Sequence, residues 1–440
     1  MRDPLGFRWW VSSQICPGVY HGAPSVPRRA RAARPARGGP WSPRIHCRLT
    51  PRSQAGTGYS GAVTDPAFDT SVVIVGAGQA GLSVAFYLRR LGLDPGNDFV
   101  ILDRGPGTGG AWQFRWEALR LGYAHRVNDL PGMGELDLSF DTADRQAPAK
   151  DVVADYYARY EQHFGLQVVR PANVTRVEGL MDGFTVTFDD SSARHGGSAA
   201  ATAGLTTQQV TTRVLVNATG TWGAPFIPWY PGLDSFRGRM VHTSEYRDAE
   251  EFRRQRVAIV GGGTSAIGFL MELEKVAAET TWFSRRPIEF LEEQELNIES
   301  GSSSVRQQDE AARQGRALPS IVSTTGVPRS RRIQAAIDRG LLLAQPMFTR
   351  VTPHGVVLPD GREVEVDAII WATGFRPELR HLAPLKLREK SGGITVGQGA
   401  SWRNSRVFFA GYGPAASTIG ANRAGRTIAR QVIATLSSFG

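Results

Sequence analysis

The chain has 440 residues, of which 41% are hydrophobic and 9% aromatic, and this length and apolar content favour a globular protein of more than one domain. Its net charge of +10 would suit a nucleic-acid-binding protein, but residues 1–68 contain ten arginines and only two acids, and so hold eight of those charges. The remaining chain is nearly neutral, and we therefore expect no nucleic-acid partner.

The N-terminal segment, residues 1–68, is rich in arginine, proline and glycine, and residues 26–44 have no periodic apolar face. Because such a segment cannot bury enough apolar surface to fold, we predict that it is disordered. The pair Arg28-Arg29 lacks the apolar stretch that an export signal needs, and we favour a true start near Val63 over a targeting arm. No stretch of the sequence is apolar for long enough to predict a membrane span.

Both cysteines, Cys16 and Cys47, lie in this segment, and residues 69–440 contain none. The rest of the chain therefore cannot form a disulfide, a thiolate nucleophile or a cysteine metal ligand, and we predict no metal site. Without an export signal, the default expectation is a cytoplasmic protein. No motif indicates an oligomeric state.

The first folded segment predicts a strand, a tight turn and a helix. Residues 72–75 are a β-branched run typical of a buried parallel strand, and residues 82–91 have helical apolar spacing. The turn between them reads G-x-G-x-x-G, which in this context binds the pyrophosphate of a dinucleotide at the start of the helix. The alternative is a glycine turn with nothing bound. The predicted contacts are Gly76, Gly78, Gln79, Ala80 and Gly81.

The next strand, residues 99–103, ends in an acid. Asp103 is placed to bind the hydroxyl groups of a ribose, and Arg104 follows it directly. A glycine-rich loop then contains Gly110 and Trp112, which we expect to lie along the same cofactor, although Trp112 could equally serve packing alone.

Residues 256–273 repeat the pattern of strand, glycine turn and helix, and two complete fingerprints call for two dinucleotides. The predicted contacts are Gly261, Gly263, Thr264, Ser265 and Ala266. The following strand, residues 280–283, ends in Ser284, Arg285 and Arg286 where the first unit has an acid. Guanidinium groups bind a 2′-phosphate that an acid would repel, so we assign FAD or NAD to the first site and NADP to the second. The alternative for these arginines is a solvated charge run.

The remaining strands are predicted at residues 184–188, 211–217, 368–371 and 407–411, with a long hairpin loop at 191–210 and a final helix within 412–430. Two of them end in small residues that would let a flat ligand approach the backbone. We expect Ala372, Thr373, Gly374 and Gly411 to contact a cofactor. A plain final strand and helix is the alternative for the C-terminus.

Residues 236–246, FRGRMVHTSEY, place Phe236, Gly238, His242 and Tyr246 at fixed offsets in a stretch without helical or strand period. Together with the two glycine turns they resemble the flavin-containing monooxygenases and related bacterial oxidoreductases, over residues 72–440. The family fingerprint F-x-G-x-x-x-H-x-x-x-(Y/F) is matched at every defined position. The resemblance implies that this segment sets the relation of the two cofactors, rather than acting as an acid or base.

The resemblance also implies an α/β fold with two nested Rossmann-like domains behind the arm at 1–68. An FAD-binding domain would comprise residues 69–235 and 371–440, with an NADPH-binding domain, residues 236–370, inserted between its parts. NADPH would reduce FAD, O2 would add to the reduced flavin as a C4a-hydroperoxide, and one oxygen atom would pass to a nitrogen or sulfur nucleophile of a small-molecule substrate.

Other activities share these motifs. A Baeyer–Villiger monooxygenase ranks second, because its fingerprint carries Trp where Tyr246 stands. An NADPH oxidase that releases H2O2 and a flavin-bound protein without turnover are further alternatives, although the latter would not need Arg285 and Arg286. The missing cysteine pair excludes a dithiol reductase. Three features depart from the usual pattern: Tyr412 follows Gly411 where many two-dinucleotide flavoenzymes have an acid, Ala266 ends the second turn, and residues 287–338 form a polar stretch that could be a mobile cover or a substrate-access element.

Overall fold

The computed structural model describes residues 68–124, 127–189, 207–291, 298–318, 327–416 and 418–439, which belong to one compact unit, Asp65–Gly440. The predicted disordered arm lies outside them except for Phe68, and so does most of the predicted hairpin loop. None of the helices in these ranges is both long and apolar enough to cross a membrane.

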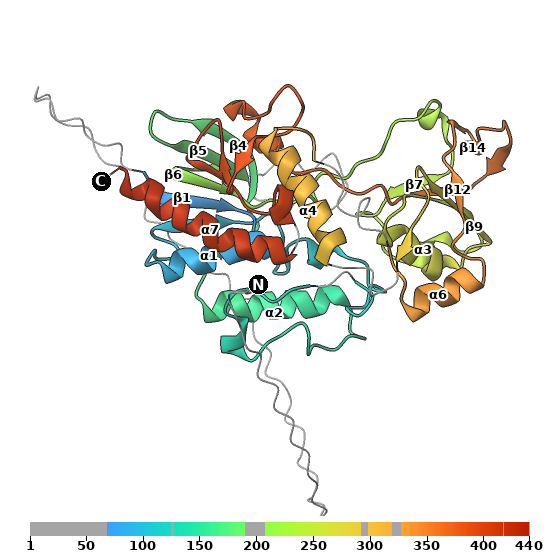
Figure 1. Cartoon of the computed structure of the whole chain (residues 1–440), viewed down its shortest axis with the longest axis horizontal. Coiled ribbons are helices and arrows are strands. Elements are labelled where there is room, and N and C mark those ends of the chain that lie inside the picture. The colour runs from blue at the N-terminus through green and yellow to red at the C-terminus, as the bar shows by residue number, and fades with distance from the viewer. Residues whose placement is uncertain are drawn as a thin grey trace, which may run out of the picture. The chain divides into compact units, whose positions relative to one another are not determined.

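The first sheet has nine strands, and its centre is parallel (Figure 1). Successive side chains of β1 enter two different apolar clusters, Val72 and Ile74 on one face and Val73 and Val75 on the other. Because both faces are buried, the strand is continuously apolar, as the sequence predicts. The order of strands across the sheet is β17 (Val396–Gly397), β18 (Ala400–Ser401), β19 (Val407–Phe409), β6 (Thr207–Asn217), β1 (Thr70–Val75), β2 (Phe99–Leu102) and β3 (Val168–Val169). Outside this order, β5 (Phe184–Asp189) pairs with β6, and β4 (Asn173–Gly179) pairs with β5.

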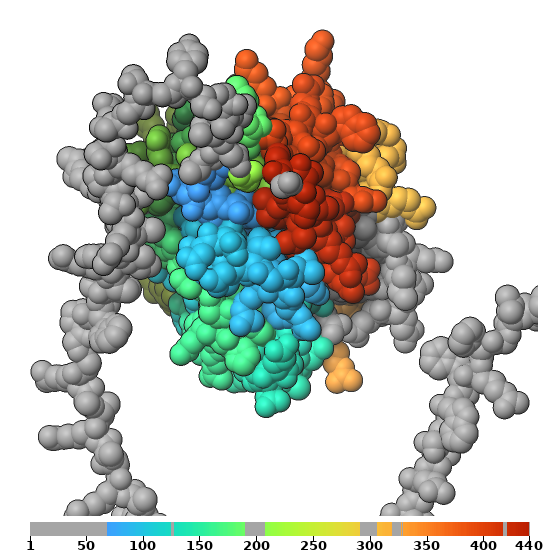
Figure 2. Space-filling view, turned by 90° about the vertical axis from the view of Figure 1, so that its left-hand side faces the viewer, coloured from blue at the N-terminus to red at the C-terminus, as the bar shows by residue number. Residues whose placement is uncertain are grey.

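Three helices cover one face of this sheet: α1 (Gln79–Arg90), α2 (Ala149–His163) and α7 (Thr418–Ser437). Helices α1 and α7 lie side by side, and Figure 2 shows the C-terminal segment, in red, against the segment around α1, in blue. Two predicted boundaries are wrong. Helix α1 begins three residues earlier than predicted because the end of the glycine turn is already helical. Helix α7 begins at Thr418, after the 3-10 turn η7 (Gly413–Ala416), where a small-residue turn was predicted, but it continues to Ser437, beyond the predicted limit at residue 430.

The second sheet is entirely parallel, in the order β12 (Ala344–Pro346), β9 (Glu279–Ser284), β8 (Arg256–Val260), β16 (Ala368–Trp371) and β7 (Arg239–His242). Helices α3 (Thr264–Leu273) and α6 (Arg331–Asp338) lie beside it in Figure 1. The predicted strands at 256–260, 280–283 and 368–371 are confirmed. The two sheets and their covering helices confirm the predicted α/β class.

Strand β7 corrects the sequence analysis, which found no strand period in residues 236–246. Among the described strands it lies at the edge of the sheet and pairs only with β16, from Arg239 opposite Ala368 to His242 opposite Trp371. Its first two residues are exposed and its last two are buried, so hydrophobicity does not alternate along it. Strand β6 also begins at Thr207, four residues earlier than predicted, because it continues the antiparallel ladder with β5.

The polar stretch at 287–338 contains helices α4 (Ile298–Arg313) and α6 together with the two-stranded sheet of β10 (Phe290–Leu291) and β11 (Val327–Pro328). Helix α4 buries Ala311 and Ala312, and the latter belongs to the cluster under the first sheet. A small antiparallel sheet, β13 (Arg350–Thr352), β14 (Gly355–Val357) and β15 (Glu363–Glu365), adjoins the second sheet's core through Val351 and Val356.

Candidate functional site

The first glycine turn joins β1 to α1, and two of its glycines are required by the backbone itself. Gly76 has a left-handed φ of +104°, and a Cβ there would lie 2.5 Å from the Ala218 carbonyl oxygen. A Cβ at Gly81 would lie 1.9 Å from the Gly76 carbonyl oxygen. Neither position has room for a side chain.

Gly78 differs because space is left beside it. The nearest described heavy atom to a Cβ at Gly78 is Gly110 Cα, at 3.9 Å. Gly110 has φ +54°, and its own Cβ would lie 2.7 Å from Gly78 Cα, so this loop passes directly beside the turn. A Cβ at Gly411 would lie 3.2 Å from Ala80 Cβ. The structure thus gathers four predicted contacts around the start of α1.

Both helices that begin at a glycine turn have a glycine at the N-cap, Gly78 for α1 and Gly263 for α3, and neither glycine has a side chain to accept the first N–H groups. By contrast, Ser330 Oγ accepts a hydrogen bond from Ile333 N at 3.3 Å and so caps α6. Uncapped N–H groups and the helix dipole favour a bound anion. Both turns therefore fit the pyrophosphate of a dinucleotide.

The Gln79 side chain is held by protein partners. Its Nε2 donates to the Asn128 carbonyl at 2.9 Å and to Asn422 Oδ1 at 3.1 Å, and the Tyr157 hydroxyl donates to its Oε1 at 2.8 Å. Gln79 therefore joins α1 to α2 and α7, and it has only its backbone to offer a ligand.

Asp103 follows β2 directly and is 8% exposed, and its side chain, like that of Gln79, forms hydrogen bonds within the protein. Arg170 Nε donates to Asp103 Oδ2 at 2.9 Å, and the other Arg170 nitrogens donate to both oxygens of Glu161 at 2.6 and 2.7 Å. Burial raises the pKa of Glu161, although Arg170 opposes this. Arg104 points elsewhere, since its NH1 lies 3.6 Å from the Glu378 carboxylate. The hydrogen bonds of Arg170 to Asp103 and Glu161 therefore hold the side chain of Asp103, the predicted ribose-binding acid, in one position.

The second glycine turn joins β8 to α3. Gly261 has φ +140°, and a Cβ there would lie 2.2 Å from the Ala372 carbonyl oxygen, so Ala372 closes this turn as Ala218 closes the first. Ala266 is fully buried in the core cluster of the second sheet. This turn therefore accepts a methyl group at the position where the first turn has no room for one.

The residues after β9 leave two positive charges accessible. Ser284 is buried, and its Oγ donates to the Arg286 carbonyl at 2.7 Å. Arg285 and Arg286 are exposed, and within the described ranges neither forms an ion pair. Their charge is available to an anion such as a 2′-phosphate.

The fingerprint residues of 236–246 all make structural contacts. A Cβ at Gly238 would lie 2.3 Å from the Asp367 carbonyl oxygen and 2.5 Å from the Phe236 ring, so the largely buried ring of Phe236 packs directly on this glycine. His242 is 1% exposed at the end of β7, and its Nε2 lies 2.9 Å from the Gly374 carbonyl oxygen.

The His242 ring is neutral. Burial lowers its pKa, although the Gly374 carbonyl and Glu245 oppose the shift. Because a carbonyl can only accept, Nε2 carries the proton, and Nδ1 accepts from Ser244, whose Oγ lies 3.0 Å away. His242 therefore fastens the turn at Gly374, where φ is +78°, to the end of β7. Thr373 is fastened separately, since its hydroxyl donates to the Phe226 carbonyl.

Tyr246 completes the fingerprint and forms a hydrogen bond with a partly buried acid, Glu272. Its hydroxyl donates to Glu272 Oε2 at 3.1 Å, and Trp116 Nε1 donates to Glu272 Oε1 at 2.7 Å. The centroid of the Tyr246 ring lies 4.3 Å from that of Phe269 and 5.8 Å from that of Trp116, which it meets edge-on. Trp116 follows the loop beside the first turn, whereas Glu272 lies on α3, so these contacts join the surroundings of the two turns.

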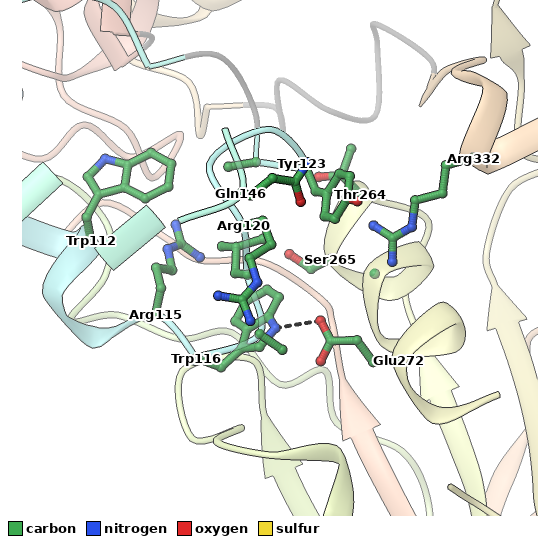
Figure 3. A pocket seen from close by; sticks show the side chains of 14 residues that line it. Trp112, Arg115, Trp116, Arg120, Tyr123, Gln146, Thr264, Ser265, Glu272 and Arg332 are labelled. Carbon is green, nitrogen blue, oxygen red and sulfur yellow. Dashed lines mark hydrogen bonds between the residues drawn. The ribbon is translucent and has the colours of Figure 1, made fainter. Parts of the chain in front are cut away.

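A cavity of about 270 Å³ lies between these two sets of residues (Figure 3). Three predicted site residues line it, Trp112 from the first unit and Thr264 and Ser265 from the start of α3. The sequence analysis missed its other polar walls. These are Arg115, Trp116, Arg120, Tyr123, Gln146, Glu272 and Arg332.

Arg115 is the most desolvated cation of this cavity. Its guanidinium carbon lies 4.3 Å from the Trp222 ring centroid and 5.4 Å from that of Trp112, and its buried Nε has no hydrogen-bond partner among the described atoms. Burial lowers its pKa to about 10. Together with Arg120, Arg332 and the dipole of α3, it makes the cavity suitable for an anionic ligand.

Comparisons with known proteins agree with this geometry. The family model described as pyridine nucleotide-disulphide oxidoreductase matches residues 70–300. A solved flavin-containing monooxygenase from Stenotrophomonas maltophilia is 33% identical, with 83% of this chain and 98% of that chain covered and a TM-score of 0.64. Oryza sativa indole-3-pyruvate monooxygenase YUCCA4 is 28% identical over 72% of this chain and 76% of its own length. The oxidoreductase CzcO of Bacillus velezensis is 24% identical over 76% and 89%.

Proposed function

Because this chain belongs to the pyridine nucleotide-disulphide oxidoreductase family and to the flavin-containing monooxygenases, we propose that it is an FAD-dependent, NADPH-consuming enzyme that transfers one oxygen atom from O2 to a soft nitrogen or sulfur atom of a small molecule. The observation that carries the proposal is the pair of glycine turns, each opening onto an uncapped helix start. The helix start at the second turn lines a cavity together with Trp112, which follows the loop beside the first turn.

FAD is assigned to the first turn and NADPH to the second. Residues 69–235 and 371–440 would form the flavin domain, and residues 236–370 the nicotinamide nucleotide domain. The space beside Gly78 and the close approach of Gly110 and Gly411 support the flavin site. The exposed Arg285 and Arg286 support NADPH over NADH, since both could contact the 2′-phosphate that NADH lacks.

The bound flavin would supply the redox chemistry with O2, and the protein would supply binding and orientation. The helix starts would hold the pyrophosphates, Asp103 would accept a hydrogen bond from a ribose hydroxyl, and the cavity walls would keep water from the reacting atoms. His242 is neutral and already hydrogen-bonded on both nitrogens, so its role is to hold the fingerprint segment against Gly374 rather than to transfer a proton.

The proposal is tested by reconstituting the purified protein with FAD and then measuring NADPH and NADH oxidation, bound nucleotide, oxygenated product and H2O2. We expect two bound nucleotides per chain, faster turnover with NADPH, and one oxygenated product per NADPH with an amine or thioether. A protein that holds only one nucleotide would refute the two-site assignment. Stoichiometric H2O2 without product would identify an oxidase, and oxygenation of ketones alone would identify a Baeyer–Villiger enzyme.

A further inference from the structure

The Glu272 carboxylate is held in an unusual way for a partly buried acid. Its two oxygens accept hydrogen bonds from Trp116 and Tyr246, which are both neutral donors, and among the described residues no arginine or lysine forms an ion pair with it. Burial raises its pKa, and the two hydrogen bonds and the more distant Arg332 only oppose this. A partly buried carboxylate without a counter-ion adds little to stability, because burial removes part of its hydration and no opposite charge replaces it. Its position therefore calls for a role other than stability.

Helix α3 connects Glu272 to the second glycine turn. Thr264, Gly268 and Glu272 follow one another at four-residue intervals, and all three line the cavity, so they lie on one face of the helix. Because a helix rises about 1.5 Å per residue, the carboxylate lies about 12 Å along a rigid rod from the N–H groups that would bind a pyrophosphate. A displacement of Glu272 would therefore also move the N-terminal end of α3, where Thr264 lies.

A short connection joins Trp116 to the first glycine turn. The 3-10 helix η1 (Gly110–Phe114) begins at the glycine that lies against Gly78, and Trp116 follows two residues after it ends. Trp116 is 4% exposed, and its ring packs on Phe269 of α3 at 5.0 Å. In Figure 3 its hydrogen bond to Glu272 bridges the two sides of the cavity.

We propose that Glu272 is a positioning residue that, through Trp116, sets the separation of the two nucleotide sites and thereby the rate of hydride transfer between them. The inference rests on the proposed function. In this step a hydride, one proton with two electrons, leaves the reduced nicotinamide, which is oxidised, and passes to the oxidised flavin, which is reduced. Such a transfer is sensitive to displacements of about 1 Å, so a looser contact slows it without weakening either nucleotide's own binding contacts.

The test compares Glu272→Leu, which removes both acceptor oxygens, and Trp116→Phe, which removes the donor, in the full-length FAD-bound protein. Anaerobic stopped-flow absorbance at varied NADPH gives the rate constant of flavin reduction and the dissociation constant of NADPH separately. We expect either variant to slow reduction about tenfold with a dissociation constant within about twofold of the wild type. The double variant should be no slower than the slower single variant, because both remove the same contact. Glu274→Ala, which removes a partly exposed carboxylate beside the end of α3 together with its ion pair to Arg339, should leave the rate unchanged.

Hydrogen–deuterium exchange of the flavin-free protein gives a second readout. Exchange of residues 112–124 and of α3 should become faster in Glu272→Leu and not in Glu274→Ala. If NADPH does not reduce the wild type at all, the proposed function fails and this inference with it. If the wild type is reduced but both variants react at its rate, only this inference is overturned. A lower melting temperature or flavin content with a normal reduction rate in the flavin-bound fraction would show a purely structural role, which also overturns it.

Discussion

The two glycine turns share one backbone design but differ in what surrounds them. In the first, the acid after the second strand is buried and bound by Arg170, whereas in the second, Ser284 bonds back to Arg286 and leaves two arginines exposed. The turns themselves recognise what all dinucleotides share, the pyrophosphate. Under the proposed assignment, selectivity between nucleotides would be built one strand later, where the two units have opposite charge.

The turns also differ at their third position, where Gly81 has no space and Ala266 is accommodated. We expect Gly81→Ala to abolish a folded, flavin-containing protein, because its Cβ would collide with the backbone of Gly76. Gly78→Ala should fold, since its Cβ has 3.9 Å of space, but should bind FAD at least about tenfold more weakly if the pyrophosphate passes there. Flavin absorbance per protein and circular dichroism separate the two effects. Wild-type FAD affinity in Gly78→Ala would mean that no ligand approaches this turn.

The buried acid of the first unit should depend strongly on its arginine. Arg170→Met leaves Asp103 and Glu161 buried without their partner, so we expect a loss of about 3–5 kcal/mol in the free energy of unfolding. Arg339→Met breaks an exposed pair with Glu274 beside the second unit and should cost less than about 1 kcal/mol. Urea unfolding followed by circular dichroism measures both. Equal losses of unfolding free energy in the two variants would show that burial does not make the ion pairs of Arg170 more important for stability than the pair of Arg339.

Each unit also buries one neutral histidine, and they should respond differently to acid. His381 Nε2 bonds Asn217 at the end of β6 at 2.7 Å, and burial, with Arg104 nearby, lowers its pKa to about 4. Between the ordinary value of 6.5 and about 4 the unfolded chain binds the extra proton, so stability falls as pH falls through this window, by up to about 3 kcal/mol. The pKa of His242 is also lowered, but Glu245 and the Gly374 carbonyl oppose the shift.

The measurement is the melting temperature as a function of pH. His381→Gln keeps a donor for Asn217 but takes up no proton, so its loss of stability between pH 6.5 and 4 should be shallower than in the wild type. His354→Gln removes an exposed histidine and should leave the profile unchanged. A wild-type slope in His381→Gln would assign the acid sensitivity to other groups.

The parts of the fold that the sequence predicts are those whose cause is local. Strands β1, β8 and β16 are apolar runs bounded by glycine or small residues, and the glycines at 76 and 261 stand where the backbone needs a positive φ. Strand β7 was missed because an edge strand that is half exposed has no regular apolar pattern. The first unit's acid and the arginines after β9 could likewise be found, since their positions follow from the strand ends.

The partners of these residues could not be predicted. Arg170 lies 67 residues from Asp103, and Glu272 lies 156 residues from Trp116, so only the assembled sheets bring them together. The contacts of Gln79 could not be predicted either, because this residue lies inside the glycine motif but its side chain forms hydrogen bonds with other parts of the protein. A fingerprint identifies which backbone positions meet a ligand, but the network around them is a property of the tertiary structure.

The smallest expected effect tests the other half of the comparison, the arginines after β9. Replacing Arg285 and Arg286 together by Ala should raise KM for NADPH by about tenfold, equivalent to about 1.4 kcal/mol, and should leave KM for NADH nearly unchanged, because NADH has no 2′-phosphate to lose contact with. The wild-type KM for NADPH should also rise more steeply with salt than that of the variant, since exposed charges are screened. Replacing Arg350 and Arg362 together by Ala also removes two exposed charges, from the sheet of β13 to β15, and controls for the change in net charge. An unchanged preference for NADPH in the double variant would place phosphate recognition in the cavity arginines instead, where Arg120 and Arg332 face the start of α3.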